Sequence, residues 1–300
     1  MRQPDLFRGT GVALITPFRD AEIDFEALDR MIEHVVTGGV DFIVSLGTTG
    51  EPVNMSAAEC RRVFDFTIEK LKGRLPLVAG LFGSNYTQKL VRGIRDYDLS
   101  GFDAIMSSSP SYIKPTQEGI FQHYMAIEAV SPIPIIIYNV PGRTASNVQS
   151  QTILRLANAS EKFIAVKEAS GDMVQGMQII RDRPEGFLVL SGDDPTALPL
   201  IACGGDGVIS VIANALPRAF SSMTRAALEG DMARARKLNH SMLDIHPLLY
   251  VEGNPAGVKA VLDMKGLCTP EVRIPLTSVT EKTRHQLEET LKKSGYLSNS

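Results

Sequence analysis

The sequence predicts an α/β protein whose fold is a (β/α)8 TIM barrel with a C-terminal helical extension. Short apolar runs recur roughly every thirty residues, and each is followed by a segment in which apolar residues have helical spacing. Runs that are apolar at nearly every position are typical of parallel strands buried on both faces. Eight such strand and helix units in succession favour a closed barrel over an open, doubly wound sheet.

The expected strands can be placed directly on the sequence. They occupy residues 11–18, 41–47, 75–82, 102–110, 133–141, 163–170, 187–194 and 206–211. Helix signals fill the intervals. After the first run, the residues on one face of an expected helix are Phe25, Leu28, Ile32 and Val35. After the second run, Ser56-Ala-Ala-Glu59 has the pattern of a capping box.

The last part of the chain is expected to form a helical extension. The glycine-rich segment 203–210 is expected to turn the chain from the seventh helix into the eighth strand. From about Pro217 onward no further strand is expected, so we predict a catalytic barrel over residues 1–228 and a helical extension over residues 229–300. No linker rich in Gly, Ser or Pro separates them, and the extension should therefore pack on the barrel.

Composition excludes several classes of function. The 31 basic and 34 acidic residues give a net charge of -3, too weak to indicate nucleic acid or a membrane surface as a partner. The first apolar run is too short for a signal peptide or a membrane span, so a cytoplasmic location is expected. The three cysteines, Cys60, Cys203 and Cys268, are expected to be buried reduced thiols. Neither histidine spacing nor glycine patterns indicate a metal or a nucleotide cofactor.

Polar residues gather where the expected strands end. These segments are Gly47-Thr48-Thr49-Gly50-Glu51, Ser109-Pro110-Ser111-Tyr112, Tyr138-Asn139-Val140-Pro141-Gly142-Arg143, Lys167-Glu168 and Gly192-Asp193-Asp194. Each has a purely structural alternative, such as a tight turn at the glycines or a helix cap at Asp193. Active sites of such barrels lie at the C-terminal ends of the strands, and the convergence of these residues on that rim predicts a catalytic site.

Lys167 gives the strongest single indication of chemistry. Strict alternation along the strand places Phe163, Ala165 and Lys167 on one face and the other side chains on the opposite face. Enclosure disfavours the charged form of a lysine, and a neutral amine can attack a carbonyl carbon. The alternative is a buried ion pair. Glu168 points to the opposite face, but Asp193 could provide the partner.

The neighbouring groups indicate a substrate that carries carboxylates. Arg143 has the two-pronged donor geometry that suits a carboxylate, and Thr48 and Thr49 offer hydroxyl and backbone donors for another. Tyr138 and Tyr112, together with the Thr48 hydroxyl, could relay protons between Lys167 and solvent.

The ordered motifs resemble the dihydrodipicolinate synthase and N-acetylneuraminate lyase superfamily. They are GTGVALITPF, GTTGE, YNVPGRT, KEASG, SGDD and EGNPAGVKA, and they extend over essentially the whole chain. The resemblance implies that Lys167 forms a Schiff base with pyruvate and that Tyr138, Thr48 and Tyr112 are the proton relay. It implies further that Tyr112 completes the site of a neighbouring subunit in a homodimer or homotetramer.

The resemblance also implies roles for the residues around the lysine. Thr49 would hold the pyruvate carboxylate and Arg143 the carboxylate of the second substrate, while Gly192 and Ile209 would line the pocket near Lys167. The arginine and the paired threonines resemble the synthase branch, which condenses pyruvate with L-aspartate 4-semialdehyde to 4-hydroxy-tetrahydrodipicolinate. Two alternatives remain open: a related aldolase or dehydratase for a sugar-derived 2-keto acid, and a catalytically silent sensor of small carboxylates.

Positions that resemble the family's lysine feedback site depart from its pattern. They read Ser111, Pro52, Ala57, Cys60 and Lys89, and only Asn85 fits. A cationic Lys89 would repel a lysine ligand. We therefore expect L-lysine to inhibit weakly or not at all.

Overall fold

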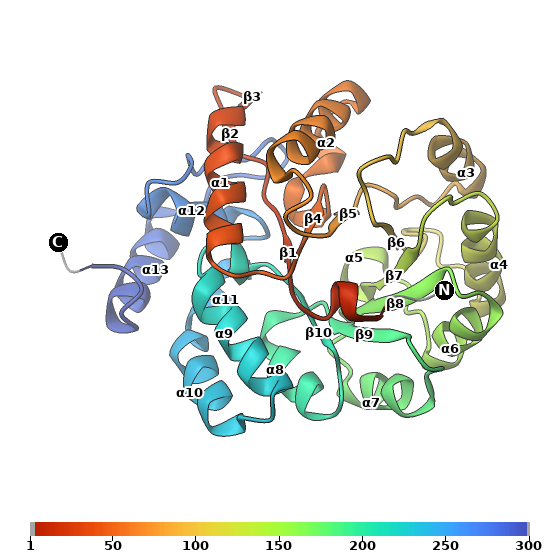
Figure 1. The fold of residues 1–300 in the computed structure, drawn as a ribbon. Helices are drawn as coiled ribbons and strands as arrows, with labels where there is room; N and C mark the ends of the chain where they lie inside the picture. The colour runs from red at the N-terminus through yellow and green to blue at the C-terminus, as the bar shows by residue number, and fades with distance from the viewer. Residues whose placement is uncertain (1–3, 299–300) are drawn as a thin grey trace.

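The computed structural model describes residues 4–298 and contains a closed barrel of eight parallel strands enclosed by helices (Figure 1). The strands are β1 (Gly9–Ala13), β4 (Phe42–Ser45), β5 (Leu77–Ala79), β6 (Ala104–Ser108), β7 (Ile135–Asn139), β8 (Phe163–Glu168), β9 (Leu188–Ser191) and β10 (Gly207–Ser210). Their order is β1-β10-β9-β8-β7-β6-β5-β4, and β4 pairs with β1 to close the barrel. The predicted fold and its eight strands are confirmed. A small hairpin, β2 (Phe18–Arg19) with β3 (Glu22–Ile23), follows β1.

The barrel helices follow the strands as the sequence predicts. They are α1 (Phe25–Thr37), α2 (Ala57–Leu71), α3 (Thr87–Asp96), α4 (Gln117–Glu128), α5 (Pro141–Thr144), α6 (Ser150–Ala159), α7 (Met173–Asp182), α8 (Asp194–Ala202) and α9 (Pro217–Leu228). Short 3-10 turns are η1 (Pro4–Phe7), η2 (Thr48–Gly50), η3 (Pro52–Asn54) and η4 (Ile212–Asn214). The predicted capping box is confirmed, because Ser56 Oγ accepts from Glu59 N at 3.2 Å while Ser56 N donates to the Glu59 carboxylate at 2.8 Å.

The C-terminal part consists of helices that lie beside α1, α8 and α9 (Figure 1). They are α10 (Met232–Met242), α11 (Ile245–Tyr250), α12 (Ala256–Met264) and α13 (Glu281–Lys293). Met242 of α10 and Leu287 of α13 belong to the same apolar cluster as Leu28 of α1. The helices are therefore held on the barrel by shared apolar burial, and the division at residues 228 and 229 stays a prediction.

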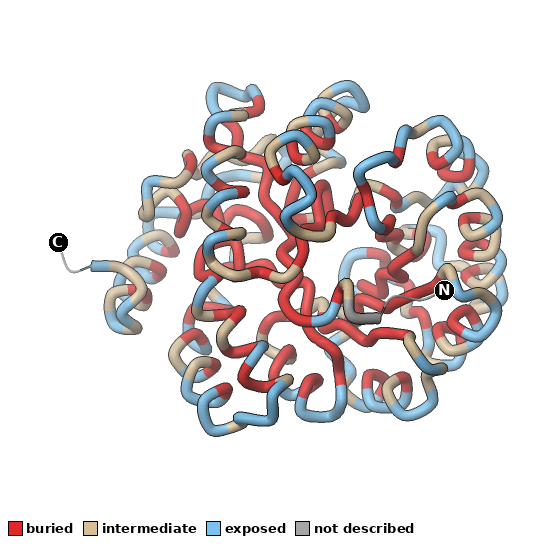
Figure 2. Tube along the Cα trace, viewed as in Figure 1, coloured by how far each residue is buried: buried red, intermediate tan, exposed pale blue. Residues whose placement is uncertain are grey.

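Two apolar clusters build the core. One lies between the strands and the surrounding helices, and the other fills the barrel interior with residues such as Phe42, Ile136 and Leu190. Figure 2 shows the buried strands at the centre and exposed residues on the outer faces of the helices. Such a layered interior is a packed core that leaves the strand ends free to carry chemistry.

The predicted alternation along β8 is wrong at its first two residues, because Phe163 lies outside the barrel and Ile164 lies inside it. Phe163 belongs to the outer cluster and packs edge-on against Tyr124 of α4, whereas Ala165 lies in the barrel interior. The register between β7 and β8 shifts here, because Ile135 pairs with Phe163 and Ile136 with Ala165. An extra residue of this kind reverses the side-chain phase. Regular alternation begins only after the irregularity and places Lys167 inward.

The cysteine prediction holds for two of the three residues. Cys60 and Cys268 are buried, and burial raises the pKa of each thiol to about 11. Cys203 is exposed because it directly follows the end of α8. Between residues 4 and 298, no helix is long and apolar enough to cross a membrane.

Candidate active site

Lys167 lies inside the barrel on β8, with 4% of its surface exposed. Its register partner on β7 is Tyr138, and Lys167 Nζ lies 4.4 Å from the centre of the tyrosine ring. Within residues 4–298, Lys167 Nζ has neither an ion-pair partner nor a hydrogen bond. Asp193, the alternative partner, instead caps α8 and accepts from Thr196 N at 3.3 Å. The amine is thus buried and uncommitted.

Glu168 faces away from Lys167, as the alternation predicts. Its carboxylate accepts from Asn139 Nδ2 at 3.0 and 3.2 Å, from Gln175 Nε2 at 3.0 Å and from Ser170 N at 2.7 Å. These bonds tie the end of β8 to β7 and to α7. The backbone that carries Lys167 is therefore fixed from the outer side of the barrel.

Gly192 leaves the space that the lysine side chain occupies. A Cβ at this position would lie 3.0 Å from Lys167 Cγ, 3.1 Å from Lys167 Cε and 2.6 Å from Ala169 Cβ. Ile209, on β10, is buried in the interior cluster together with Tyr138. Among the predicted pocket residues, Gly192 thus leaves room for the Lys167 side chain, and Ile209 forms part of the apolar interior.

The paired threonines lie in η2, directly after β4. Thr49 is buried, and its hydroxyl accepts from Asn254 Nδ2 at 3.0 Å. Thr48 is half-buried, and over the described part of the chain its hydroxyl makes no hydrogen bond. Thr48 therefore has a hydroxyl free for a substrate or a relay, while Thr49 is positioned by the segment that precedes α12.

A buried ion pair anchors this threonine loop. Lys259 Nζ lies 2.6 Å from Glu51 Oε1, and the two side chains are 0% and 1% exposed. Lys259 also donates to the Glu271 carbonyl at 2.8 Å, and Glu51 accepts from Arg273 N at 3.2 Å. Burial lowers the pKa of Lys259, and the Glu51 charge opposes this change. Glu51 and Lys259 lie in the GTTGE and EGNPAGVKA motifs, and neither residue was predicted to have a role.

Arg143 and Tyr112 lie on the surface of the rim. Arg143 is exposed on the short helix α5. Tyr112 is 86% exposed, and its backbone N–H donates to the Thr144 carbonyl at 3.1 Å, so its loop is attached to the loop after β7. Within a single chain the structure brings Lys167, Tyr138 and Gly192 together and leaves Tyr112 pointing into solvent.

Asp194, buried at the start of α8, makes a contact with α11 that was not predicted. Asp194 accepts from the backbone N–H groups of Val211 and Ile212 at 3.0 and 2.8 Å, and the Tyr250 hydroxyl lies 3.5 Å away. Burial raises the pKa of Asp194 and raises that of Tyr250 well above its usual value, with Tyr138 and Arg143 among the charges acting on Tyr250. In the sequence, only the position of Asp194 at the end of a strand indicated that its carboxylate could have a role near the site.

The barrel and its interior lysine define the class of protein. A closed parallel barrel with a buried, uncommitted amine near the strand ends and hydroxyl groups beside it is the arrangement of a Schiff-base lyase of the aldolase type. The profile of the dihydrodipicolinate synthetase family matches residues 6–294. The chain belongs to this family, and the family predicted from the motifs is confirmed.

Relatives match over nearly the whole chain. A 4-hydroxy-tetrahydrodipicolinate synthase from Flavobacterium psychrophilum is 46% identical over 283 residues, which cover 94% of this chain and 96% of that protein. The corresponding protein of Neisseria meningitidis serogroup B is 43% identical over 293 residues, 97% of this chain and 100% of the relative.

Solved structures agree with this match. Dihydrodipicolinate synthase from Aquifex aeolicus has a TM-score of 0.93 and 40% identity, covering 98% of this chain and 100% of that chain. The chloride-inhibited enzyme of Acinetobacter baumannii, complexed with pyruvate, has a TM-score of 0.92 and 37% identity, covering 97% of this chain and 100% of that chain.

Proposed function

We propose that this protein is a lyase that condenses pyruvate with L-aspartate 4-semialdehyde to 4-hydroxy-tetrahydrodipicolinate in lysine biosynthesis. The observation that carries the proposal is the buried Lys167, whose Nζ is uncommitted within residues 4–298 and lies beside Tyr138. Relatives of similar length are named 4-hydroxy-tetrahydrodipicolinate synthase, and the similar dihydrodipicolinate synthase of Acinetobacter baumannii has been solved in complex with pyruvate. No metal or organic cofactor is part of the proposal.

The first half of the reaction forms an enamine on the lysine. Lys167 Nζ attacks C2 of pyruvate, and loss of water gives an imine. Removal of a proton from C3 then gives the enamine, with the imine nitrogen taking the electron pair. Tyr138 and Thr48 move the protons that the carbonyl oxygen and C3 exchange with solvent. Thr49, positioned by Asn254, binds the pyruvate carboxylate.

The second half builds the ring and frees the enzyme. The enamine C3 attacks the aldehyde carbon of the semialdehyde, and the aldehyde oxygen takes up a proton. The amino group of the new chain then attacks the imine carbon, closes the ring and expels Lys167 as a free amine. Arg143 binds the carboxylate of the second substrate through its paired N–H groups. One water molecule leaves overall, which balances the condensation.

The role of Tyr112 in the proton relay depends on oligomerisation. We propose a homodimer, or a tetramer built from two such dimers, in which each chain lends Tyr112 to its neighbour's relay. Its 86% exposure in the single chain supports this arrangement, because a phenol so exposed cannot act on an interior lysine of the same chain without a large movement. The proposed location is the cytoplasm.

A coupled assay tests the reaction. Pyruvate and aspartate 4-semialdehyde are supplied together with a dihydrodipicolinate reductase, and nicotinamide oxidation is followed by absorbance. We expect a rate that depends on both substrates and is lost in Lys167→Met. A related aldolase for sugar-derived 2-keto acids is the alternative, and turnover of such an acid with no coupled rate would establish it.

Mixing two inactive variants tests the shared site. In a Tyr112→Phe and Lys167→Met heterodimer, one site has an intact lysine and receives Tyr112 from the other chain. We expect the mixture to regain activity after subunits exchange, while each variant alone stays slow. A mixture no faster than the sum of its parts would contradict the sharing of Tyr112.

A further inference from the structure

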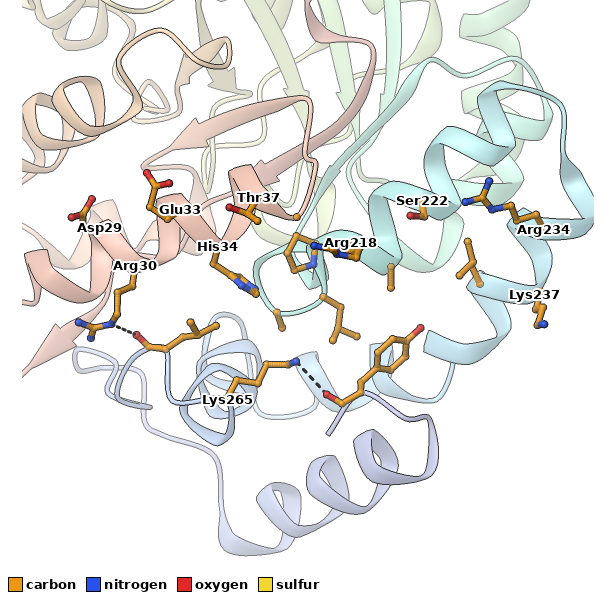
Figure 3. A pocket seen from close by; sticks show the side chains of 18 residues that line it. Asp29, Arg30, Glu33, His34, Thr37, Arg218, Ser222, Arg234, Lys237 and Lys265 are labelled. Atoms are coloured by element: carbon orange, nitrogen blue, oxygen red, sulfur yellow. Dashed lines mark hydrogen bonds between the residues drawn. The ribbon is translucent and has the colours of Figure 1, made fainter. Parts of the chain in front are cut away.

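A cavity of about 1010 Å³ lies outside the barrel, between α1, α9, α10 and the end of the chain (Figure 3). None of its lining residues belongs to the proposed catalytic site. Much of the wall is apolar, with Leu216, Pro217, Leu238, Leu267 and Tyr296 among the contributors. The space is therefore suited to the apolar body of a small molecule.

The charged groups around this cavity are unbalanced. Five cationic side chains line it: Arg30, Arg218, Arg234, Lys237 and Lys265. The two acidic side chains, Asp29 and Glu33, already form ion pairs with Lys70 and Arg74, which are not part of the lining. Positive charge is thus in excess here, although the whole chain has a net charge of -3.

Most of these cations lack a protein counter-charge. Among residues 4–298, no carboxylate forms an ion pair with Arg218, Arg234 or Lys237. Within the described part of the chain, Lys265 donates only to the Tyr296 carbonyl at 3.2 Å, and burial lowers the pKa of its amine. A half-buried amine with one neutral acceptor would gain from an anion beside it.

His34 adds an unsatisfied polar atom to the same cavity. Its ring interacts with the backbone of Asn214 and Ala215, while its Nε2 is buried and has no partner among the residues that the structure describes. Figure 3 shows His34 and Lys265 extending from opposite sides toward the open space. A buried nitrogen without a partner is costly unless a water molecule or a ligand satisfies it.

We propose that this cavity is a binding site for small organic anions, in which a carboxylate, sulfonate or phosphate is attracted by the cations of the wall, Arg218, Arg234 and Lys265 among them, and an apolar body packs on Leu216 and Leu238. The combination of excess positive charge with apolar walls selects this class. A free cation such as L-lysine is disfavoured by the same charges. The site is separate from the barrel mouth, so its ligand binds together with substrates.

The probe is 8-anilino-1-naphthalenesulfonate, an aromatic anion whose fluorescence rises in apolar surroundings. The full-length protein is first reduced with borohydride in the presence of pyruvate, so that the barrel mouth is blocked. We expect one probe molecule per chain, and much weaker binding of the neutral N-phenyl-1-naphthylamine. Arg218→Gln and Arg234→Gln should each weaken binding of the anion about fivefold.

Arg236→Gln is the matched control, because Arg236 is exposed on the same helix as Arg234 but does not line the cavity. It should change the affinity less than twofold, and circular dichroism should show all variants folded. Equal affinities for all three variants, or equal binding of the neutral probe, would overturn the proposal. The proposal would also be overturned if the probe bound only after dilution had dissociated an oligomer, as shown by a lower molecular mass. In that case a second copy of the chain would cover this face.

Discussion

Replacing Gly192 with alanine tests whether the position of Lys167 depends on the missing side chain. The added methyl would lie 3.0 Å from Lys167 Cγ, 3.1 Å from Lys167 Cε and 2.6 Å from Ala169 Cβ. Carbon atoms in ordinary contact are ~3.5–4.0 Å apart. The lysine must therefore move by roughly 0.5–1 Å, and the backbone at Ala169 must also shift to relieve the 2.6 Å contact.

A displacement of this size has a predictable cost. A misplacement of ~1 Å can lower the rate about 100-fold. We expect kcat/KM in the coupled assay to fall ~10–100-fold, equivalent to ~1.4–2.7 kcal/mol of transition-state stabilisation. Overpacking should lower the free energy of unfolding by ~1–3 kcal/mol, which leaves the protein folded.

Two further variants separate the effects of the Gly192 change. Gly93→Ala adds the same methyl to α3, where nothing lies within 4 Å, and should leave the rate unchanged. Combining Gly192→Ala with Ala169→Gly removes the 2.6 Å contact but keeps the overlap with the lysine, so stability should recover more than activity. A Gly192→Ala enzyme within twofold of the wild-type kcat/KM would refute the argument.

Three other predictions concern stability and regulation. Lys259→Met should lower the free energy of unfolding measured in urea by ~3–5 kcal/mol, because it leaves the buried Glu51 carboxylate unpaired. Adding Glu51→Gln should recover part of that loss. An unchanged urea midpoint in Lys259→Met would contradict this role of the ion pair. Burial lowers the pKa of His123 to about 4. Between about pH 6.5 and pH 4 the unfolded chain therefore binds a proton at this residue while the folded chain does not. The free energy of unfolding should fall as the pH drops through this range. The wild type should lose ~2 kcal/mol more than His123→Gln between pH 7 and pH 4.5, and parallel curves would refute this. L-lysine should leave the steady-state rate unchanged at sub-millimolar concentration, because the cationic Lys89 at the position that matches the feedback site would repel a lysine ligand. Inhibition in that concentration range would refute this prediction.

Patterns among residues close in the sequence were sufficient to predict much of the fold. Continuous apolar runs and a capping box depend on neighbouring residues, and both are confirmed, as is the inward direction of Lys167 toward Tyr138. The error in side-chain direction at Phe163 and Ile164 has a different origin. It arises from the register between β7 and β8, which depends on how two strands pair and is not encoded in either strand alone.

Contacts between distant segments could not be predicted in the same way. Glu51 and Lys259 are 208 positions apart, and Asn254 reaches Thr49 across 205 positions. Tyr250 of α11 approaches Asp194 of α8 across 56 positions. A single sequence shows that such residues are polar within apolar surroundings, but it does not show which partner each of them finds.

The formation of an imine on Lys167 is the central claim, and trapping it is the most direct test. The protein is incubated with pyruvate and borohydride, digested, and its peptides are analysed by mass spectrometry. The reduced pyruvate adduct should appear on Lys167 in stoichiometric amount, be absent without pyruvate and be absent from the buried Lys259. An adduct on another lysine, or full condensing activity in Lys167→Met, would contradict the account.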